Sequence, residues 1–474
     1  MTKEYDLVVL GGGIGGYVAA IRATQLGMSV ALVEKDKLGG TCLHEGCIPS
    51  KALLKTAEMY RQFHHASEFG LEIQDMQINL NKAQERKEKV VNTLFQGVTN
   101  LLNQAKVDIY KGTGRILGSS IFSPMPGTVS VEYDDGKENT TLTNKFVLIA
   151  TGSTPSNLPN LTVDGEFIMH AHHALQLESL PESIVIVGAG AIGIEWASLL
   201  QDLGVEVSVI ESNATILGET DRDVSKEVQK QLEARGVQIF TNAQLDIGSV
   251  EVKNEQVHLQ AKTKDRVVDF LADKMLLAVG REANIAELGL QNTSIEMENG
   301  VIQTNDTCQT KENHIYAIGD CIGGMQLAHV ASAEGVIAVE HMANVKPKPL
   351  DTMHVPVCVY SHPEVASVGL TEEKAVELGY KVKIGSFPFQ GIGKAHINGN
   401  PSGFNKIIID EKTEDILGIH IVGSHATELI SEASLAKMLD ATAWEISQTI
   451  HPHPSLSEGL FESALAVDGL EIHG

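Results

Sequence analysis

Apolar residues recur along the chain in an order that predicts strands alternating with helices. The run Leu7–Leu10 is followed by small and apolar residues at helical spacing, and an apolar strand returns at Ser29–Val33. The stretch SIVIVGAGAIGIEWASLLQDLGVEVSVIES (183–212) repeats this order. Two strand–helix–strand units are therefore predicted.

Other stretches predict helices that do not belong to these units. SKALLKTAEMYRQF (50–63) continues as a helix after Pro49, a residue that fits a first helical turn. The stretch Ala83–Ala105 is amphipathic and is expected to face a core. Its apolar positions are Val90, Val91, Leu94, Val98, Leu101 and Leu102.

Both predicted units carry the same glycine pattern after their first strand. The residues are Gly11, Gly13, Gly16 and Glu34 in the first unit, and Gly188, Gly190, Gly193 and Glu211 in the second. Such glycines let the backbone approach a pyrophosphate at a helix N-terminus, and the acidic residue binds a ribose hydroxyl. The spacing from middle glycine to acidic residue is identical (13 to 34 and 190 to 211), which favours two dinucleotide sites over phosphate-free units.

The residues after each motif indicate which dinucleotide binds. Glu211 would repel a 2′-phosphate and no arginine follows it closely, so the second site is predicted to bind NAD and not NADP. The first motif is followed by Cys42 and Cys47 in GGTCLHEGCIPSK. Flavin accepts electrons both from a thiolate and as hydride, so the first site is predicted to bind FAD.

The spacing of Cys42 and Cys47 requires a bent backbone if the two are to be bridged. In a straight helix they would lie about 7.5 Å apart along the axis, beyond the roughly 4.4–6.8 Å that a disulfide allows. The neighbouring glycines permit the bend, and Cys47 is expected near a helix N-terminus, where the dipole stabilises a thiolate. We interpret the pair as a redox-active disulfide, with a passive structural disulfide as the alternative. No metal is predicted, because no second Cys/His cluster stands at suitable spacing.

The C-terminal stretch HPHPSLSE offers a proton acceptor for thiol–disulfide exchange, which needs a base near neutral pH. His451 and His453 are both candidates. Ser455 to Glu458 reads S-x-x-E and is expected to open a final helix. Glu458 is then either a capping carboxylate at the third helical position or a hydrogen-bond partner that orients an imidazole.

Together, GGTCLHEGCIPSK, HPHPSLSE, the two dinucleotide motifs and IYAIGD resemble the flavoprotein disulfide reductases, and within them the dihydrolipoyl dehydrogenases, over essentially the whole chain. PGTVSVE and IHPHPSLSE are similar to the bacterial branched-chain 2-oxo-acid dehydrogenase type. The resemblance implies NAD-dependent reoxidation of protein-bound dihydrolipoamide as the E3 component of such a complex. It also implies a homodimer whose partners are the lipoyl and subunit-binding domains of an acyltransferase (E2) component.

The resemblance further implies roles for single residues. Cys42 would meet lipoamide, Cys47 would be the thiolate beside the flavin, and Glu458 would orient His453 as the base. The implied cofactor contacts are Lys51 at the flavin N5, paired with Glu195; Asp320 at the flavin ribitol; Gly114 and Ala328 at FAD; and Gly280 at NAD. Without the resemblance, Asp320 reads as part of a Gly-Asp turn, and Gly114, Ala328 and Gly280 read as ordinary turn or packing residues.

The fold class expected is α/β, with two Rossmann-like domains and a C-terminal α+β interface domain. We place an FAD domain at 1–150 and 276–350, an NAD domain at 151–275 and the interface domain at 351–474. Two other functions stay open: an NADH oxidase or transhydrogenase of the same fold, and a flavin-bearing subunit that serves only assembly.

The composition narrows the choice of partners. A net charge of −25 argues against nucleic acid or an anionic membrane. No apolar run approaches the roughly 20 residues of a membrane span, and the N-terminus lacks the pattern of a signal peptide. The chain is therefore expected to be cytoplasmic, where a close cysteine pair is more often catalytic than structural.

Overall fold

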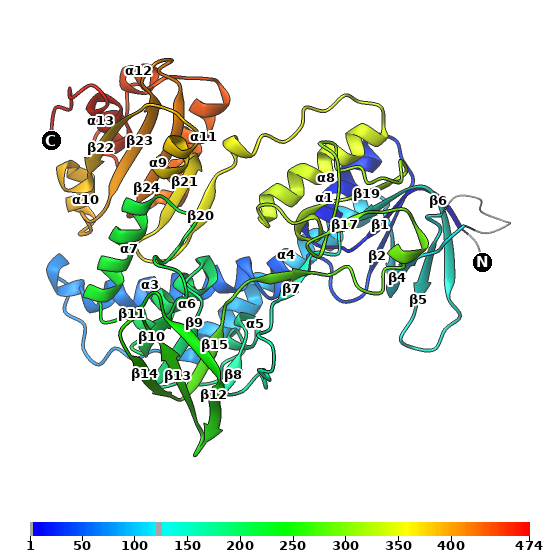
Figure 1. Cartoon of the computed structure of the whole chain (residues 1–474), viewed down its shortest axis with the longest axis horizontal. Coiled ribbons are helices and arrows are strands. Elements are labelled where there is room, and N and C mark those ends of the chain that lie inside the picture. The colour runs from blue at the N-terminus through cyan, green and yellow to red at the C-terminus, as the bar shows by residue number, and fades with distance from the viewer. Residues whose placement is uncertain (1–2, 120–125) are drawn as a thin grey trace. The chain divides into compact units, whose positions relative to one another are not determined.

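The structure is a computed structural model that describes residues 3–119 and 126–474. The chain divides into two compact units (Figure 1). Unit 1 comprises Met1–Ala52, Asn81–Ser156 and Gly280–Leu350, and unit 2 comprises Leu53–Leu80, Asn157–Val279 and Asp351–Gly474. The finer division into FAD, NAD and interface domains stays a prediction.

Unit 1 is built on a seven-stranded sheet with the path β3-β2-β1-β6-β5-β4 and with β19 also paired to β6. Its strands and helices are β1 (Lys3–Leu10), α1 (Ile14–Gln25), β2 (Val30–Glu34), α2 (Gly40–His44), the start of α3 (Cys47–His64), α4 (Leu80–Gln104), β3 (Asp108–Lys111), β4 (Thr113–Ile116), β5 (Val129–Glu132), β6 (Thr140–Ile149), β7 (Ser153–Pro155), β16 (Arg281–Ala283), β17 (Met297–Glu298), β18 (Val301–Ile302), β19 (Ile315–Ala317) and α8 (Ala328–Met342).

The apolar runs of unit 1 form the parallel centre of this sheet. Val8 lies between Ala31 of β2 and Val147 of β6 in the strand register, and all three are fully buried. Helices α1 and α8 lie side by side in this unit (Figure 1). They can approach closely because Gly335 of α8 packs against the backbone of Gly15 in α1.

Unit 2 holds a parallel five-stranded sheet, β11-β10-β9-β15-β8, an antiparallel β12-β13-β14 sheet, and an antiparallel five-stranded sheet, β20-β21-β24-β23-β22. Its elements, besides the remainder of α3, are β8 (Ile168–Met169), α5 (Ala171–Ala174), β9 (Ser183–Val187), α6 (Ala191–Asp202), β10 (Glu206–Ile210), α7 (Arg222–Ala234), β11 (Gln238–Phe240), β12 (Gln244–Lys253), β13 (Gln256–Lys262), β14 (Val267–Ala272), β15 (Lys274–Leu277), β20 (Val357–Val359), β21 (Val365–Gly369), α9 (Glu372–Glu377), β22 (Val382–Pro388), α10 (Gly393–Ile397), β23 (Phe404–Asp410), β24 (Ile416–Val422), α11 (Ala426–Met438), α12 (Ala443–Gln448) and α13 (Glu458–Ala466).

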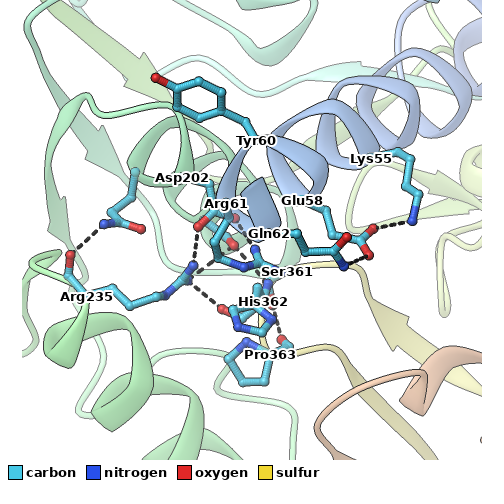
Figure 2. Close-up of polar contacts among 12 residues, drawn as sticks. Lys55, Glu58, Tyr60, Arg61, Gln62, Asp202, Arg235, Ser361, His362 and Pro363 are labelled. Carbon is cyan, nitrogen blue, oxygen red and sulfur yellow. Dashed lines mark hydrogen bonds and ion pairs between the residues drawn. The ribbon is translucent and has the colours of Figure 1, made fainter. Parts of the chain in front are cut away.

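A buried polar cluster joins three segments of unit 2 (Figure 2). Asp202, at the end of α6, accepts hydrogen bonds from Arg61 of α3 and, at 2.6 Å, from Arg235. Arg235 also donates to the carbonyl oxygen of His362 at 2.5 Å. Burial and the two guanidinium charges lower the pKa of His362 to about 2, so its imidazole stays neutral.

One expectation about the long helix is wrong in part. In α4, Val91, Val98 and Leu102 are buried as expected, but Leu94 and Leu101 are 42% and 50% exposed. The apolar positions span more of the helix circumference than a single packed face covers, so only one stripe of them reaches the core.

Candidate active site

Both dinucleotide motifs form the same turn, and both require glycine at its first position. Gly11 and Gly188 have φ angles of +103° and +101°, in the region that side chains rarely adopt. A Cβ atom at either would lie 2.3 Å from a carbonyl oxygen, that of Ala150 or Ala278 respectively. The parallel strand next to each turn therefore excludes any side chain there.

The middle glycines have a different environment, which fits a ligand. At Gly190 a Cβ atom would meet nothing within 4 Å, and at Gly13 only a Gly40 Cα at 4.0 Å. These glycines are also the N-caps of α6 and α1, and neither helix has a side-chain cap. Open space beside uncapped N–H groups at a helix start is the cradle that a pyrophosphate needs. Both turns therefore fit a dinucleotide.

The acidic residues Glu34 and Glu211 are held at these turns by matching hydrogen bonds. One oxygen of each accepts from the N–H after the first glycine, at 2.6 Å from Gly12 and at 2.8 Å from Ala189. The second oxygen accepts at 2.7 Å, in both, from the N–H two residues along the chain. Each carboxylate thus stands at the end of its strand, where a ribose hydroxyl is expected.

The cysteine pair lies in unit 1, next to the first dinucleotide turn. Cys42 is in α2 and Cys47 is the first residue of α3, so the chain bends between them as the sequence predicts. Their side chains hydrogen-bond to each other. This bond and burial raise the pKa of Cys42 above its ordinary value, although the positive charge of Lys51 acts in the opposite direction. This shift favours the protonated form of Cys42, and the role of Cys47 at the helix N-terminus as the thiolate stays a prediction.

His453 and Glu458 form a pair in unit 2. His453 Nδ1 lies 2.8 Å from Glu458 Oε1, and the imidazole is 78% exposed. Within residues 3–119 and 126–474, Nε2 makes no hydrogen bond, so it can exchange a proton with a substrate. A carboxylate on Nδ1 fixes the tautomer that leaves Nε2 as the acceptor.

His451, the other candidate base, is engaged on both sides. Its Nε2 lies 2.7 Å from Glu432 Oε1 and its Nδ1 lies 3.0 Å from the carbonyl oxygen of Thr449. The side chain is only 5% exposed, and the bond to Glu432 raises its pKa. This geometry favours His453 over His451 as the base.

Glu458 does not occupy the third helical position that the capping pattern predicts. Helix α13 begins at Glu458 itself, with Ser457 as its N-cap, so Glu458 is not the third helical residue. Its Oε2 nevertheless accepts from the Ser455 N–H at 2.8 Å, while the Ser455 hydroxyl bonds to Ser457 instead of capping the helix. Although burial opposes ionisation, these bonds from Ser455 and His453 hold the pKa of Glu458 below its usual range.

Lys51 and Glu195 belong to different units, and their pairing stays a prediction. Lys51 is half-buried in the second turn of α3. Glu195 is buried in α6, and its Oε1 accepts from the Tyr360 N–H at 3.0 Å.

Asp320 lies between β19 and α8, where Ser153 Oγ donates to its Oδ2 and Arg281 Nε approaches to 3.7 Å. The sequence did not single out Ser153 or Arg281. Only their positions in the sequence could have pointed to them: Ser153 directly follows the turn after β6, and Arg281 lies within AVGRE.

The three weaker cofactor candidates have distinct local environments. A Cβ atom at Gly114 would lie 2.6 Å from the Leu10 side chain, so this glycine has a packing reason of its own. Gly280 has a φ of +124° and requires glycine for its turn. Ala328 is the first residue of α8, a helix without a side-chain cap. Their cofactor contacts stay predictions.

Within residues 3–119 and 126–474, no cluster of three or more His, Cys, Asp or Glu side chains is placed to hold a metal ion. No helix there combines the length and apolarity needed to cross a membrane.

Two family models match the chain. The model for pyridine nucleotide-disulphide oxidoreductases matches residues 5–335, and the model for their dimerisation domain matches residues 355–464. The dihydrolipoyl dehydrogenase of Bacillus subtilis (strain 168) is 56% identical over 473 residues, which is 100% of both chains. That of Zymomonas mobilis is 42% identical over 475 residues, again 100% of both.

Solved structures agree with this result. LpdA from Mycobacterium tuberculosis superposes with a TM-score of 0.88 at 27% identity, covering 98% of this chain and 99% of that one. The HOCl-induced flavoprotein disulfide reductase RclA from Escherichia coli superposes with a TM-score of 0.86 at 25% identity, with the same coverage. The α/β fold with two dinucleotide turns and a dimerisation domain is thus confirmed.

Proposed function

The chain belongs to the dihydrolipoyl dehydrogenases of the pyridine nucleotide-disulphide oxidoreductase family, and we propose that it reoxidises protein-bound dihydrolipoamide through Cys42 and Cys47. It is an oxidoreductase that uses FAD and NAD, and it is a homodimer. The observation that carries the proposed role is the hydrogen-bonded cysteine pair beside the first dinucleotide turn, with Cys42 in α2 and Cys47 at the start of α3.

The residues that hold the cofactors follow from the two turns. Uncapped N–H groups at the start of α1, with Glu34, suit FAD, and those at the start of α6, with Glu211, suit NAD. Bound FAD supplies a two-electron acceptor for a dithiol, and NAD supplies the final hydride acceptor. Lys51, Glu195, Asp320, Gly114, Ala328 and Gly280 are proposed as further contacts on the family resemblance.

The chemistry of the cysteine pair is thiol–disulfide exchange. One thiolate of dihydrolipoamide attacks Cys42 of the oxidised pair, which forms a mixed disulfide and releases Cys47 as a thiolate. The second substrate sulfur then displaces Cys42, so that lipoamide leaves as a disulfide and the cysteines hold the two electrons. His453 Nε2 takes the proton of the first attacking thiol, and Glu458 on Nδ1 stabilises the imidazolium that results. In the second step this proton passes to the departing Cys42 sulfur, and Nε2 takes the proton of the second substrate thiol.

The partners and the cell compartment are part of the same proposal. The lipoyl domain and the subunit-binding domain of an E2 acyltransferase are the proposed partners, and a chain of net charge −25 suits a basic docking segment. A cysteine pair that must open and close suits the reducing cytoplasm. Service to a branched-chain 2-oxo-acid complex stays a prediction.

The test is the NAD-dependent oxidation of dihydrolipoamide, followed as NADH absorbance. Cys42→Ser and Cys47→Ser should each abolish it while flavin stays bound and NADH still reduces an artificial dye. An NADH oxidase or transhydrogenase would lose little activity in either variant. A chain that serves assembly alone would show no lipoamide turnover even as wild type.

A further inference from the structure

A two-stranded ribbon in unit 1 lies beside the residue expected to contact the flavin ribitol. Strand β7 pairs antiparallel with β16, so that Ser153 stands opposite Ala283 and Pro155 opposite Arg281. The Arg281 side chain reaches diagonally back across this ribbon. It donates from Nε to Ser153 Oγ and from Nη2 to the Ser153 carbonyl oxygen, both at 2.7 Å.

These contacts form a chain of hydrogen bonds in which each donor and each acceptor is fixed. A guanidinium only donates hydrogen bonds and a carboxylate only accepts them. Since Arg281 donates to Ser153 Oγ, the single hydroxyl proton of Ser153 is directed to Asp320 Oδ2. Ser153 is 3% exposed, so water does not compete for this bond.

This chain of hydrogen bonds ends at Oδ2 of Asp320 and does not involve Oδ1. Within the described residues, all side-chain contacts of Asp320 are at Oδ2, and none is at Oδ1. The Asp320 side chain is 23% exposed, so Oδ1 can accept a hydrogen bond from a bound molecule.

A second carboxylate lies near Asp320. Glu334 of α8 accepts from the Gly319 N–H at 2.7 Å, directly before Asp320. Burial raises the pKa of Glu334, and the charge of Asp320 raises it further. Arg281 Nε, 3.7 Å from Asp320 Oδ2, supplies the counter-charge.

We propose that Arg281 is a positioning residue for FAD, which acts through Ser153 to orient the Asp320 carboxylate so that Oδ1 accepts a hydroxyl of the ribityl chain. This inference rests on the proposed function, in which Asp320 faces that chain. Arg281 has no direct contact with FAD in this arrangement, so its effect on FAD requires Asp320.

The test measures how fast FAD leaves the purified holoenzyme in a mildly chaotropic salt, followed by the rise in flavin fluorescence. Arg281→Gln is expected to release FAD about tenfold faster than wild type, which corresponds to about 1.4 kcal/mol. Ser153→Ala should also accelerate release. Arg281→Lys, which keeps the charge but loses the forked donors, should fall between wild type and Arg281→Gln.

Two comparisons make the test specific. Glu282→Gln alters an exposed residue of the same ribbon and should release FAD at the wild-type rate. In an Asp320→Asn background, Arg281→Gln should add little, because the carboxylate it orients is gone. Release from Arg281→Gln at the control rate, or an undiminished effect in the Asp320→Asn background, would overturn the proposal.

If Arg281→Gln does not fold, Ser153→Ala decides by the same comparisons. FAD release does not depend on lipoamide turnover. A chain that meets these expectations but fails to oxidise dihydrolipoamide would therefore refute the proposed function and leave this inference standing.

Discussion

His453 Nδ1 lies 2.8 Å from Glu458 Oε1, while Glu458 Oε2 is held by the Ser455 N–H. The carboxylate therefore aligns the imidazole and also secures the chain that carries it. His453→Gln should lower kcat by about 10²–10⁴-fold, the usual contribution of a general base. Glu458→Gln should give a smaller loss of about tenfold or more, because the base remains but loses its orienting charge.

The His451–Glu432 pair provides the matched control for this prediction. It has a similar contact, 2.7 Å, but the His451 imidazole is shielded from solvent. Glu432→Gln should leave kcat near wild type. If Glu458 only supports the helix start, its loss would cost about 1 kcal/mol of stability and little turnover. Urea unfolding measured beside kcat separates these two outcomes.

A second prediction concerns the homodimer. Cys42 and His453 stand about 400 residues apart along the chain, and the family resemblance suggests that a twofold-related subunit delivers His453 to each cysteine pair. Cys42→Ser and His453→Gln should each be nearly inactive alone. Reassembled as verified heterodimers, they should regain up to about half of wild-type activity, since one of the two sites is intact.

The opposite result would locate the base within one chain. If His453 served the cysteines of its own subunit, every subunit of the mixed dimer would carry one defect. Heterodimers confirmed by tagged purification would then stay inactive. Steady-state lipoamide reduction by NADH measures both cases.

The cysteine pair gives a spectroscopic prediction. Because the hydrogen bond to Cys47 and burial keep Cys42 protonated, the thiolate next to the flavin is expected to be Cys47. Two-electron reduction should add a long-wavelength charge-transfer band. Cys42→Ser should show this band even when oxidised, and Cys47→Ser should lack it. A band in the Cys47 variant would reverse the assigned roles.

Coenzyme choice is predicted from Glu211. Its oxygens are fixed by the Ala189 and Asn213 N–H groups, so the carboxylate cannot turn away from a 2′-phosphate without losing both bonds. kcat/KM should favour NAD over NADP by at least about tenfold, since about 1.4 kcal/mol suffices. Glu211→Gln combined with Ser212→Arg should narrow that ratio. Equal kcat/KM values in the wild type would contradict this reading.

The sequence predicted those features that depend on local backbone chemistry. The glycine turns, the bend between Cys42 and Cys47 and the helix that starts at Cys47 all follow from residue type and spacing. The choice between His451 and His453 could not be made, because each precedes a proline and only the tertiary partners, Glu432 and Glu458, distinguish them.

Long-range polar contacts were missed for the same reason. Arg281 and Ser153 are far apart in sequence and meet only because β7 and β16 pair. Leu94 and Leu101 are a case in which the sequence predicted burial that does not occur. Periodicity identifies the apolar positions of a helix, but it does not say which of them will pack against the core.

The last prediction concerns Lys406, a lysine on β23 whose side chain is 3% exposed. Its Nζ bonds to Asp221 at 3.0 Å, to Asp223 at 2.8 Å and to Glu372 at 2.7 Å. Lys406→Met leaves the buried carboxylate of Asp221 without its cation. It should therefore lower the free energy of unfolding by about 3–5 kcal/mol. Urea unfolding followed by tryptophan fluorescence reports this unit, since Trp196 and Trp444 are the chain's two tryptophans and both lie in unit 2.

The stability deficit of Lys406→Met should depend on pH, because Asp221 and Asp223 have shifted pKa values. The hydrogen bond from Lys406 lowers the pKa of Asp223, and the pKa of Asp221 is also lowered although its burial acts in the opposite direction. A depressed carboxyl pKa stabilises the fold above the unfolded value of about 3.9, and that stability is lost as pH falls further through the folded value. The deficit of Lys406→Met should thus be largest near neutral pH and shrink below about pH 4. Lys383→Met, on the exposed part of neighbouring β22, should leave the free energy of unfolding near the wild-type value. A Lys406→Met deficit no larger than that of Lys383→Met, or one that grows as the pH falls, would show that the network does not stabilise this unit through its charges.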